Sequence, residues 1–121
     1  MLNIGYMEFF HDEKIPKNKN TDFLKSLLAE DEEILFCFSS LRDRLAFFTS
    51  KRLVFMYTPD KVSRQLDFVH YDKFISYNII TSEKHTNAKL EANLPDIGII
   101  GFNFESLDSL LKLFTFLSNV I

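Results

Sequence analysis

The stretch from Arg44 to Tyr57 constrains the fold of this chain more than any other part of the sequence. Two apolar runs, Arg44–Thr49 and Arg52–Tyr57, lie on either side of a tight polar connection. Strand-forming runs separated by a short polar turn are typical of a β-hairpin. We therefore expect two adjacent antiparallel strands over these residues.

Other strand-like runs precede and follow this hairpin. They are residues 34–39, a run that starts near residue 63, and residues 75–81, 88–94 and 97–104. The run 88–94 alternates apolar and polar residues, which is the pattern of a strand with one buried face. Together with the hairpin, these runs predict seven antiparallel strands joined by short turns. Such an order suits a sandwich or a partly open barrel.

One helix is expected on each side of this series of strands. Thr21 or Asp22 can cap a short helix that carries Phe23 and Leu24, and the acidic run 30–33 is interpreted as its solvated end. A second, strongly apolar helix follows Ser106 to the end of the chain and caps the strands. Residues 1–20 include a polar stretch without periodicity, so we expect a loose segment over 1–20 and one domain over 21–121.

The terminal helix carries more apolar surface than one contact with a sheet needs. Its predicted core stripe is Leu107, Leu110, Leu111, Phe114, Leu117 and Ile121. Leu113, Phe116 and Val120 lie outside this stripe and widen the apolar arc to about 220° at about 100° per residue. Exposed apolar patches mark interaction sites. The second face is therefore expected to be covered by another copy of the chain, or by the N-terminal segment folding back.

Composition sets the class of protein. At 121 residues the chain is long enough for one domain, and 14 Phe with no Trp predict a core built from aromatic rings. The expected core residues are Phe36, Phe38, Phe47, Phe55, Phe68, Leu90, Phe102, Phe104, Leu110, Phe114 and Leu117. A formal charge of −3 gives no attraction to nucleic acid. The single Cys37 is expected to be a buried hydrophobe, and a cytoplasmic location is the default expectation.

The sequence carries little catalytic chemistry. His11, His70 and His85 show no metal-binding spacing, and with three glycines a phosphate-binding loop is not expected. We therefore expect no enzyme activity, no cofactor and no metal. Arg42 and Arg44 could grip a lipid headgroup at a strand loop, but Asp43 between them is equally able to form local salt bridges, which is the preferred interpretation.

The order of strands and terminal helix, together with one motif, resembles the bacterial pleckstrin-homology-like domains. The motif covers residues 42–54 and reads Arg-Asp-x-Leu-x-Phe-Phe-Thr-x-Lys-Arg-Leu-Val, with a Tyr-containing segment at 70–75 one strand later. Related lipid-binding GRAM-like domains share the Thr-x-Lys-Arg hairpin. The resemblance covers residues 24–121 and implies a non-enzymatic domain that tends to self-associate into rings. It implies phosphoinositide binding only weakly, because a defining basic headgroup motif is missing.

Two functions follow as hypotheses. The first is a module for protein interaction and self-assembly, which forms a homo-oligomer through Leu113, Phe116 and Val120 and could also bind other proteins. The alternative is a module that binds a ligand or an anionic membrane headgroup through Arg42 and Arg44.

Overall fold

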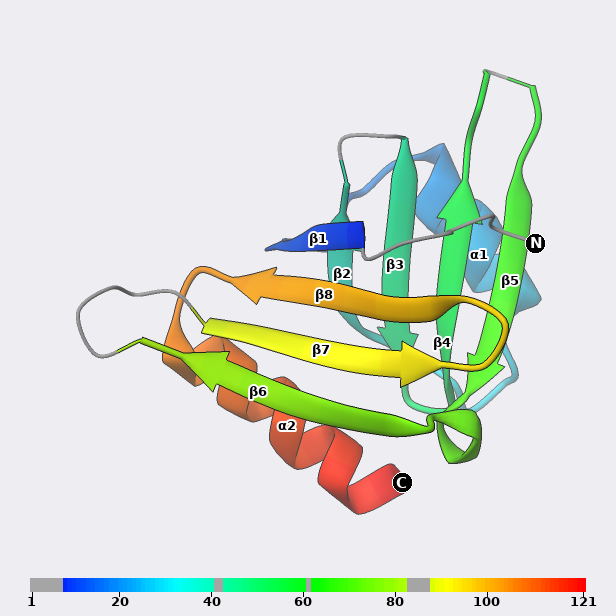
Figure 1. Ribbon diagram of the computed structural model, residues 1–121. Coiled ribbons are helices and arrows are strands. Elements are labelled where there is room, and N and C mark those ends of the chain that lie inside the picture. Colours follow the sequence, from blue (N-terminus) through cyan, green and yellow to red (C-terminus); the bar gives the residue numbers. More distant parts are fainter. Residues whose placement is uncertain (1–7, 41–42, 61, 83–87) are drawn as a thin grey trace.

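The computed structural model describes residues 8–40, 43–60, 62–82 and 88–121 of the chain. Within these residues the chain forms an eight-stranded sheet, two α-helices and one short 3₁₀ helix (Figure 1). The strands are β1 (Glu8–Glu13), β2 (Ile34–Ser39), β3 (Arg44–Thr49), β4 (Arg52–Tyr57), β5 (Gln65–His70), β6 (Ser76–Thr81), β7 (Ala88–Leu94) and β8 (Gly98–Phe104). The helices are α1 (Lys19–Leu27), the 3₁₀ helix η1 (Tyr71–Lys73) and α2 (Leu107–Val120).

The sheet is strongly curled. Its strand order is β5-β4-β3-β2-β1-β8-β7-β6. Neighbouring strands pair antiparallel, except that β1 and β8 run parallel. In Figure 1, β6, β7 and β8 cross in front of the upright strands β2 to β5, and α2 lies along the β6–β8 half. The mainly β architecture with a C-terminal helix, a partly open barrel, is thus as the sequence predicts.

Aromatic rings fill the inside of the curled sheet. Phe38, Phe48 and Phe102 meet with ring centroids 5.0 to 5.6 Å apart and steep interplanar angles, the edge-to-face arrangement that aromatic pairs favour. Most of the expected core residues are buried here or under α1. Phe36 and Phe114 are only partly buried, and the prediction for Phe68 is wrong because it lies on edge strand β5 with 39% of its surface exposed.

Helix α1 covers the outer face of the strands β2 to β4. Leu24 of α1 packs with Cys37, Phe47, Val54 and Met56 in a second buried cluster. Burial, and then the neighbouring Glu13 carboxylate, raise the pKa of the Cys37 thiol to about 12. Cys37 is therefore the small buried hydrophobe that the sequence predicts.

The N-terminal segment differs from its prediction. Residues 8–13 are not loose but form β1, which pairs with β2 on one side and β8 on the other and buries Phe10 completely. The domain accordingly has eight strands instead of seven. Helix α1 also begins earlier than expected, because Asn18 caps it by accepting a hydrogen bond from the Thr21 N–H at 3.1 Å.

Candidate functional site

The turn between β3 and β4 is held by side chains of its own motif. The Thr49 hydroxyl oxygen accepts hydrogen bonds from the backbone N–H groups of Lys51 at 3.1 Å and Arg52 at 3.0 Å. The same hydroxyl donates to the Glu32 carboxylate at 2.5 Å. Below the turn, the Tyr71 hydroxyl donates to the Thr49 carbonyl at 2.6 Å. The threonine of the hairpin motif is therefore the centre of a network that closes the turn.

Glu32 and Arg52 form a paired charge inside this network. The Arg52 guanidinium donates from Nε and Nη2 to both carboxylate oxygens of Glu32, at 3.1 and 3.2 Å, and the Ala29 N–H adds a third bond at 3.0 Å. Only 1% of the Glu32 side chain is exposed. Burial pushes the pKa of Glu32 up, but the bonds from Thr49, Ala29 and Arg52 outweigh it and leave the pKa below its ordinary value. The prediction that the acidic run 30–33 is solvated is therefore wrong for Glu32.

Lys51, which precedes Arg52 in the motif, is also engaged within the chain. Lys51 forms an exposed ion pair with Asp31 at 2.7 Å, and the Ser50 hydroxyl accepts a hydrogen bond from the Glu33 N–H at 3.1 Å. The segment 31–33 therefore binds the hairpin turn from one side. Thr49 and Arg52 are therefore engaged in the buried network, whereas Lys51 is paired with Asp31 at the surface.

Of the two arginines proposed for a headgroup, Arg42 lies outside the described residues. Arg44 stands opposite Tyr57 in the β3–β4 pair, with its guanidinium carbon 5.2 Å from the Tyr57 ring centroid. Asp43 between them has a φ of 57°, and its carbonyl accepts a hydrogen bond from the Thr58 N–H at 3.1 Å. The Asp43 backbone is therefore hydrogen-bonded to the residue that directly follows β4.

Helix α2 faces the core differently from the prediction. Leu110, Leu113 and Leu117 are completely buried, so the assignment of Leu113 to an intermolecular interface is wrong. Phe116 is partly buried against Phe36 and Tyr71 within the same chain, with ring centroids 6.3 and 5.4 Å away. Val120 is exposed.

The error has a simple cause. The sequence places the core stripe about one row of side chains away from its actual position, because a wide apolar arc does not reveal its own centre. The large apolar side chains of α2 and its C-terminal cap that face solvent are those of Leu107, Leu111, Val120 and Ile121. Leu111 has 42% of its surface exposed.

Edge strand β6 contacts helix α2 through an aromatic pair. The Tyr77 ring of β6 meets the Phe114 ring of α2 with centroids 5.8 Å apart. Ile79 follows Tyr77 on the same face of the strand, and Leu111 lies one helical turn before Phe114. Figure 1 shows that β6 and α2 run in opposite directions, so these two side chains are on the same side of the ring contact. We call Tyr77, Ile79, Leu107, Leu111 and Phe114 the β6–α2 surface.

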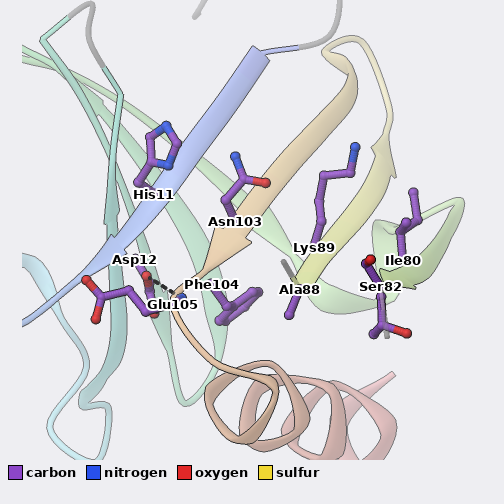
Figure 2. Close-up of a pocket in the computed structure, with 10 residues that line it drawn as sticks. His11, Asp12, Ile80, Ser82, Ala88, Lys89, Asn103, Phe104 and Glu105 are labelled. Carbon is purple, nitrogen blue, oxygen red and sulfur yellow. Dashed lines mark hydrogen bonds between the residues drawn. The ribbon is translucent and has the colours of Figure 1, made fainter. Parts of the chain in front are cut away.

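A pocket of about 630 Å³ opens at the ends of β1, β8, β7 and β6. Its floor is a row of His11, Asn103, Lys89 and Ile80, which are successive cross-strand partners (Figure 2).

Its side wall is acidic. The Asp12 carboxylate accepts hydrogen bonds from the Glu105 N–H at 3.2 and 3.4 Å, and burial is the main cause that raises the pKa of Asp12. Lys89 is 3.4 Å from Glu91. With carboxylates in its wall and its lysine already paired, the pocket does not suit an anionic headgroup.

Comparison with solved structures identifies the architecture. A DUF1696 family protein with a pleckstrin-homology domain from Shewanella loihica superposes with a TM-score of 0.64 at 13% identity, over 93% of this chain and 97% of that one. A PH-domain-containing protein from Exiguobacterium sibiricum gives 0.61 at 13% identity, over 93% of this chain and 62% of that one. The chain has a pleckstrin-homology-like fold. A pleckstrin-homology domain from Shewanella amazonensis gives 0.52 at 17% identity, over 84% and 85%.

These likenesses extend to the fold alone, since the identities are low. No protein-family model and no curated protein sequence matches the chain. Among the described residues of this PH-like domain, neither helix is long and apolar enough to cross a bilayer, and no three His, Cys, Asp or Glu side chains gather as a metal site.

Sequence reasoning predicted strand β6, but it missed the burial of Glu32 and the position of β6 at the exposed edge of the sheet. The first had no local signal, because the partners of Glu32 lie 17 and 20 residues away in the chain. The second had one, because β6 reads Ser-Tyr-Asn-Ile-Ile-Thr without a single charge.

Proposed function

We propose that this PH-like domain is a non-catalytic interaction module that assembles with copies of itself. The observation that carries the proposal is the β6–α2 surface, where Ile79 and Leu111 are 39% and 42% exposed beside the Tyr77–Phe114 contact. Apolar side chains that gather on one surface of a protein gain free energy when a partner removes them from water.

The surface also lacks features of a catalytic or anion-binding site. None of its five residues is an Asp, Glu, His, Lys or Arg, and its large side chains are apolar or aromatic. Such a surface recognises another apolar surface, and a second copy of the chain supplies one of identical chemistry. Of the predicted contacts, Leu113 is completely buried, Phe116 is partly buried, and Val120 is exposed and stays a candidate contact. The proposed surface is formed instead around Leu107 and Leu111.

The molar mass in solution tests this proposal. We expect light scattering at tens of micromolar protein to give a multiple of the chain mass of 14.2 kDa. Leu111→Glu should lower this mass, because a carboxylate would be taken out of water in the interface. Asn119→Glu is the matched control, since it adds the same charge on the polar side of α2 and should leave the mass unchanged. A monomeric mass for the unmodified protein would overturn the proposal.

Headgroup binding through Arg42 and Arg44 is the weaker candidate. Lys51 and Arg52 at the hairpin turn are paired within the chain, and Arg44 lies against the Tyr57 ring. No contact among the described residues favours an anionic ligand over these internal partners.

A further inference from the structure

The sheet has two edge strands, β5 and β6, and they differ in chemistry. On β5 the Arg52 guanidinium lies over the exposed Phe68 ring, 4.5 Å from its centroid, and Asp67 adds a charge to the strand. Charged side chains along an edge discourage another strand from pairing with it. The β5 edge is therefore protected.

Within the part of the chain that the structure describes, strand β6 carries no such charged side chain. Its six residues, Ser76 to Thr81, include no charge, no proline and no glycine, and all except Tyr77 are exposed. The residues on each side, Ile75 and Ser82, are also uncharged. Six-residue segments of this kind, with β-branched and aromatic side chains, pair readily with other strands. An edge of this composition is expected to have a partner strand in the assembled protein.

We propose that two copies of this chain pair their β6 strands antiparallel about a two-fold axis, which makes one continuous sheet. This inference rests on the self-assembly proposed above and specifies its geometry. Because the segment is neutral, two copies can approach without charge repulsion. Head-to-tail pairing of β6 with β5 of another copy would instead build a ring or an open filament. The protected β5 edge disfavours this pairing, including the ring arrangement that the family resemblance implies. Pairing of β6 with β6 uses up both unprotected edges and closes the assembly.

The pairing has a restricted register. Residues that stand directly opposite each other in an antiparallel pair point to the same face of the sheet. A two-fold axis perpendicular to the sheet keeps the two faces distinct, so it must pass through a residue position. Near the centre of β6 that position is Asn78 or Ile79. When the axis passes at Asn78, Ile79 of one copy stands opposite Tyr77 of the other copy. When the axis passes at Ile79, the two Ile79 residues stand opposite each other. In both registers these pairs lie on the face of the sheet that borders α2.

Charge placed on the edge tests the proposal. The double variant Asn78→Lys and Ile80→Lys adds two cations at exposed positions of the same face of β6. In either register these lysines of the two copies come close together, so we expect the dimer mass to fall to that of one chain. The control His70→Lys and Ile99→Lys adds equal charge at exposed positions on β5 and β8 and should leave the dimer intact.

Cysteine cross-linking tests the same geometry without relying on disruption. The single variants Asn78→Cys and Ile79→Cys each place a thiol at one candidate axis position, where the two copies come within disulfide reach. We expect one of them to form a covalent dimer with oxidised glutathione, whereas Asn119→Cys on the polar side of α2 should not. Cys37 is too buried to interfere.

The outcomes separate the two proposals. A monomeric unmodified protein overturns self-assembly and the β6 pairing together. An oligomer that survives both lysines on β6, or that yields no covalent dimer from either cysteine variant, overturns the β6 pairing alone and leaves self-assembly standing.

Discussion

Glu32 is a carboxylate that the protein has removed almost completely from water. It is tolerated because Arg52, Thr49 and the Ala29 N–H together satisfy both of its oxygens. A buried charge of this kind is a weak source of net stability but a strong constraint on geometry, since each partner depends on the others. Within the hairpin motif, the side chains of Thr49 and Arg52 are therefore held in position by this network.

Arg52→Ala removes one partner of the buried pair. We expect a loss of about 3–5 kcal/mol in the free energy of unfolding, because Glu32 would keep its charge without a counter-ion. Lys51→Ala is the neighbouring control: its ion pair with Asp31 is exposed, so the expected loss is below about 1 kcal/mol. Urea denaturation followed by circular dichroism measures both. Equal losses in the two variants would mean that the buried Glu32–Arg52 pair contributes no more to the free energy of unfolding than the exposed Lys51–Asp31 pair.

The lowered pKa of Glu32 predicts a pH dependence. Its pKa lies below the ordinary value of 4.5, so the folded state favours the ionised form. The resulting stability is present above about pH 4.5 and is lost as the pH falls through the lowered pKa of the folded state. Urea midpoints measured from about pH 7 down to about pH 3 should decline, and the decline should be shallower in Glu32→Gln. An unchanged slope in this variant would contradict the assignment.

At the scale of elements, strands with their own local signal were predictable. The hairpin β3–β4 and the alternating strand β7 were found because apolar periodicity is a property of neighbouring residues. Strand β1 was missed, because its residues after Phe10 are polar and its strand conformation depends on pairing with β2 and β8, which lie far away in the sequence. The face of α2 was missed for a similar reason, since the sheet and not the helix decides which row is buried.

The orientation of α2 gives a paired prediction. Leu113→Ala should cost about 2–5 kcal/mol, because it leaves a cavity at a completely buried position. Leu111→Ala makes the same chemical change two residues away on the exposed row, and its cost should be smaller. Thermal or urea unfolding distinguishes the two variants. A larger loss for Leu111 would restore the orientation that the sequence suggested.

At the scale of the whole molecule, the PH-like fold was predictable but the candidate site was not. The motif at 42–54 and the order of elements point to the architecture, because they reflect local patterns. Which side chains remain exposed is decided only when the sheet curls and α2 settles on it. Ile79 on β6 and Leu111 on α2 lie far apart in the sequence, and the Tyr77–Phe114 contact is what brings their elements together.

The distribution of charge over the molecule predicts that it does not bind anionic membranes electrostatically. The formal charge is −3, the pocket at the ends of β1 and β6–β8 has acidic walls, and the motif cations Lys51 and Arg52 are paired with Asp31 and Glu32. Attraction to an anionic bilayer requires clustered cations that are free to approach it. We therefore expect no salt-sensitive sedimentation with vesicles of phosphatidylcholine and phosphatidylserine.

The arginine pair at the β2–β3 loop supplies the decisive comparison for this expectation. Binding that weakens as salt rises and disappears in Arg42→Ala/Arg44→Ala would establish the headgroup function. The charge-matched control is Lys17→Ala/Lys19→Ala, which removes two exposed cations near the start of α1. If vesicle binding fell equally in both variants, it would report net charge and not recognition by the arginines. If no binding occurred at all, headgroup recognition by the arginines would be excluded for these vesicles.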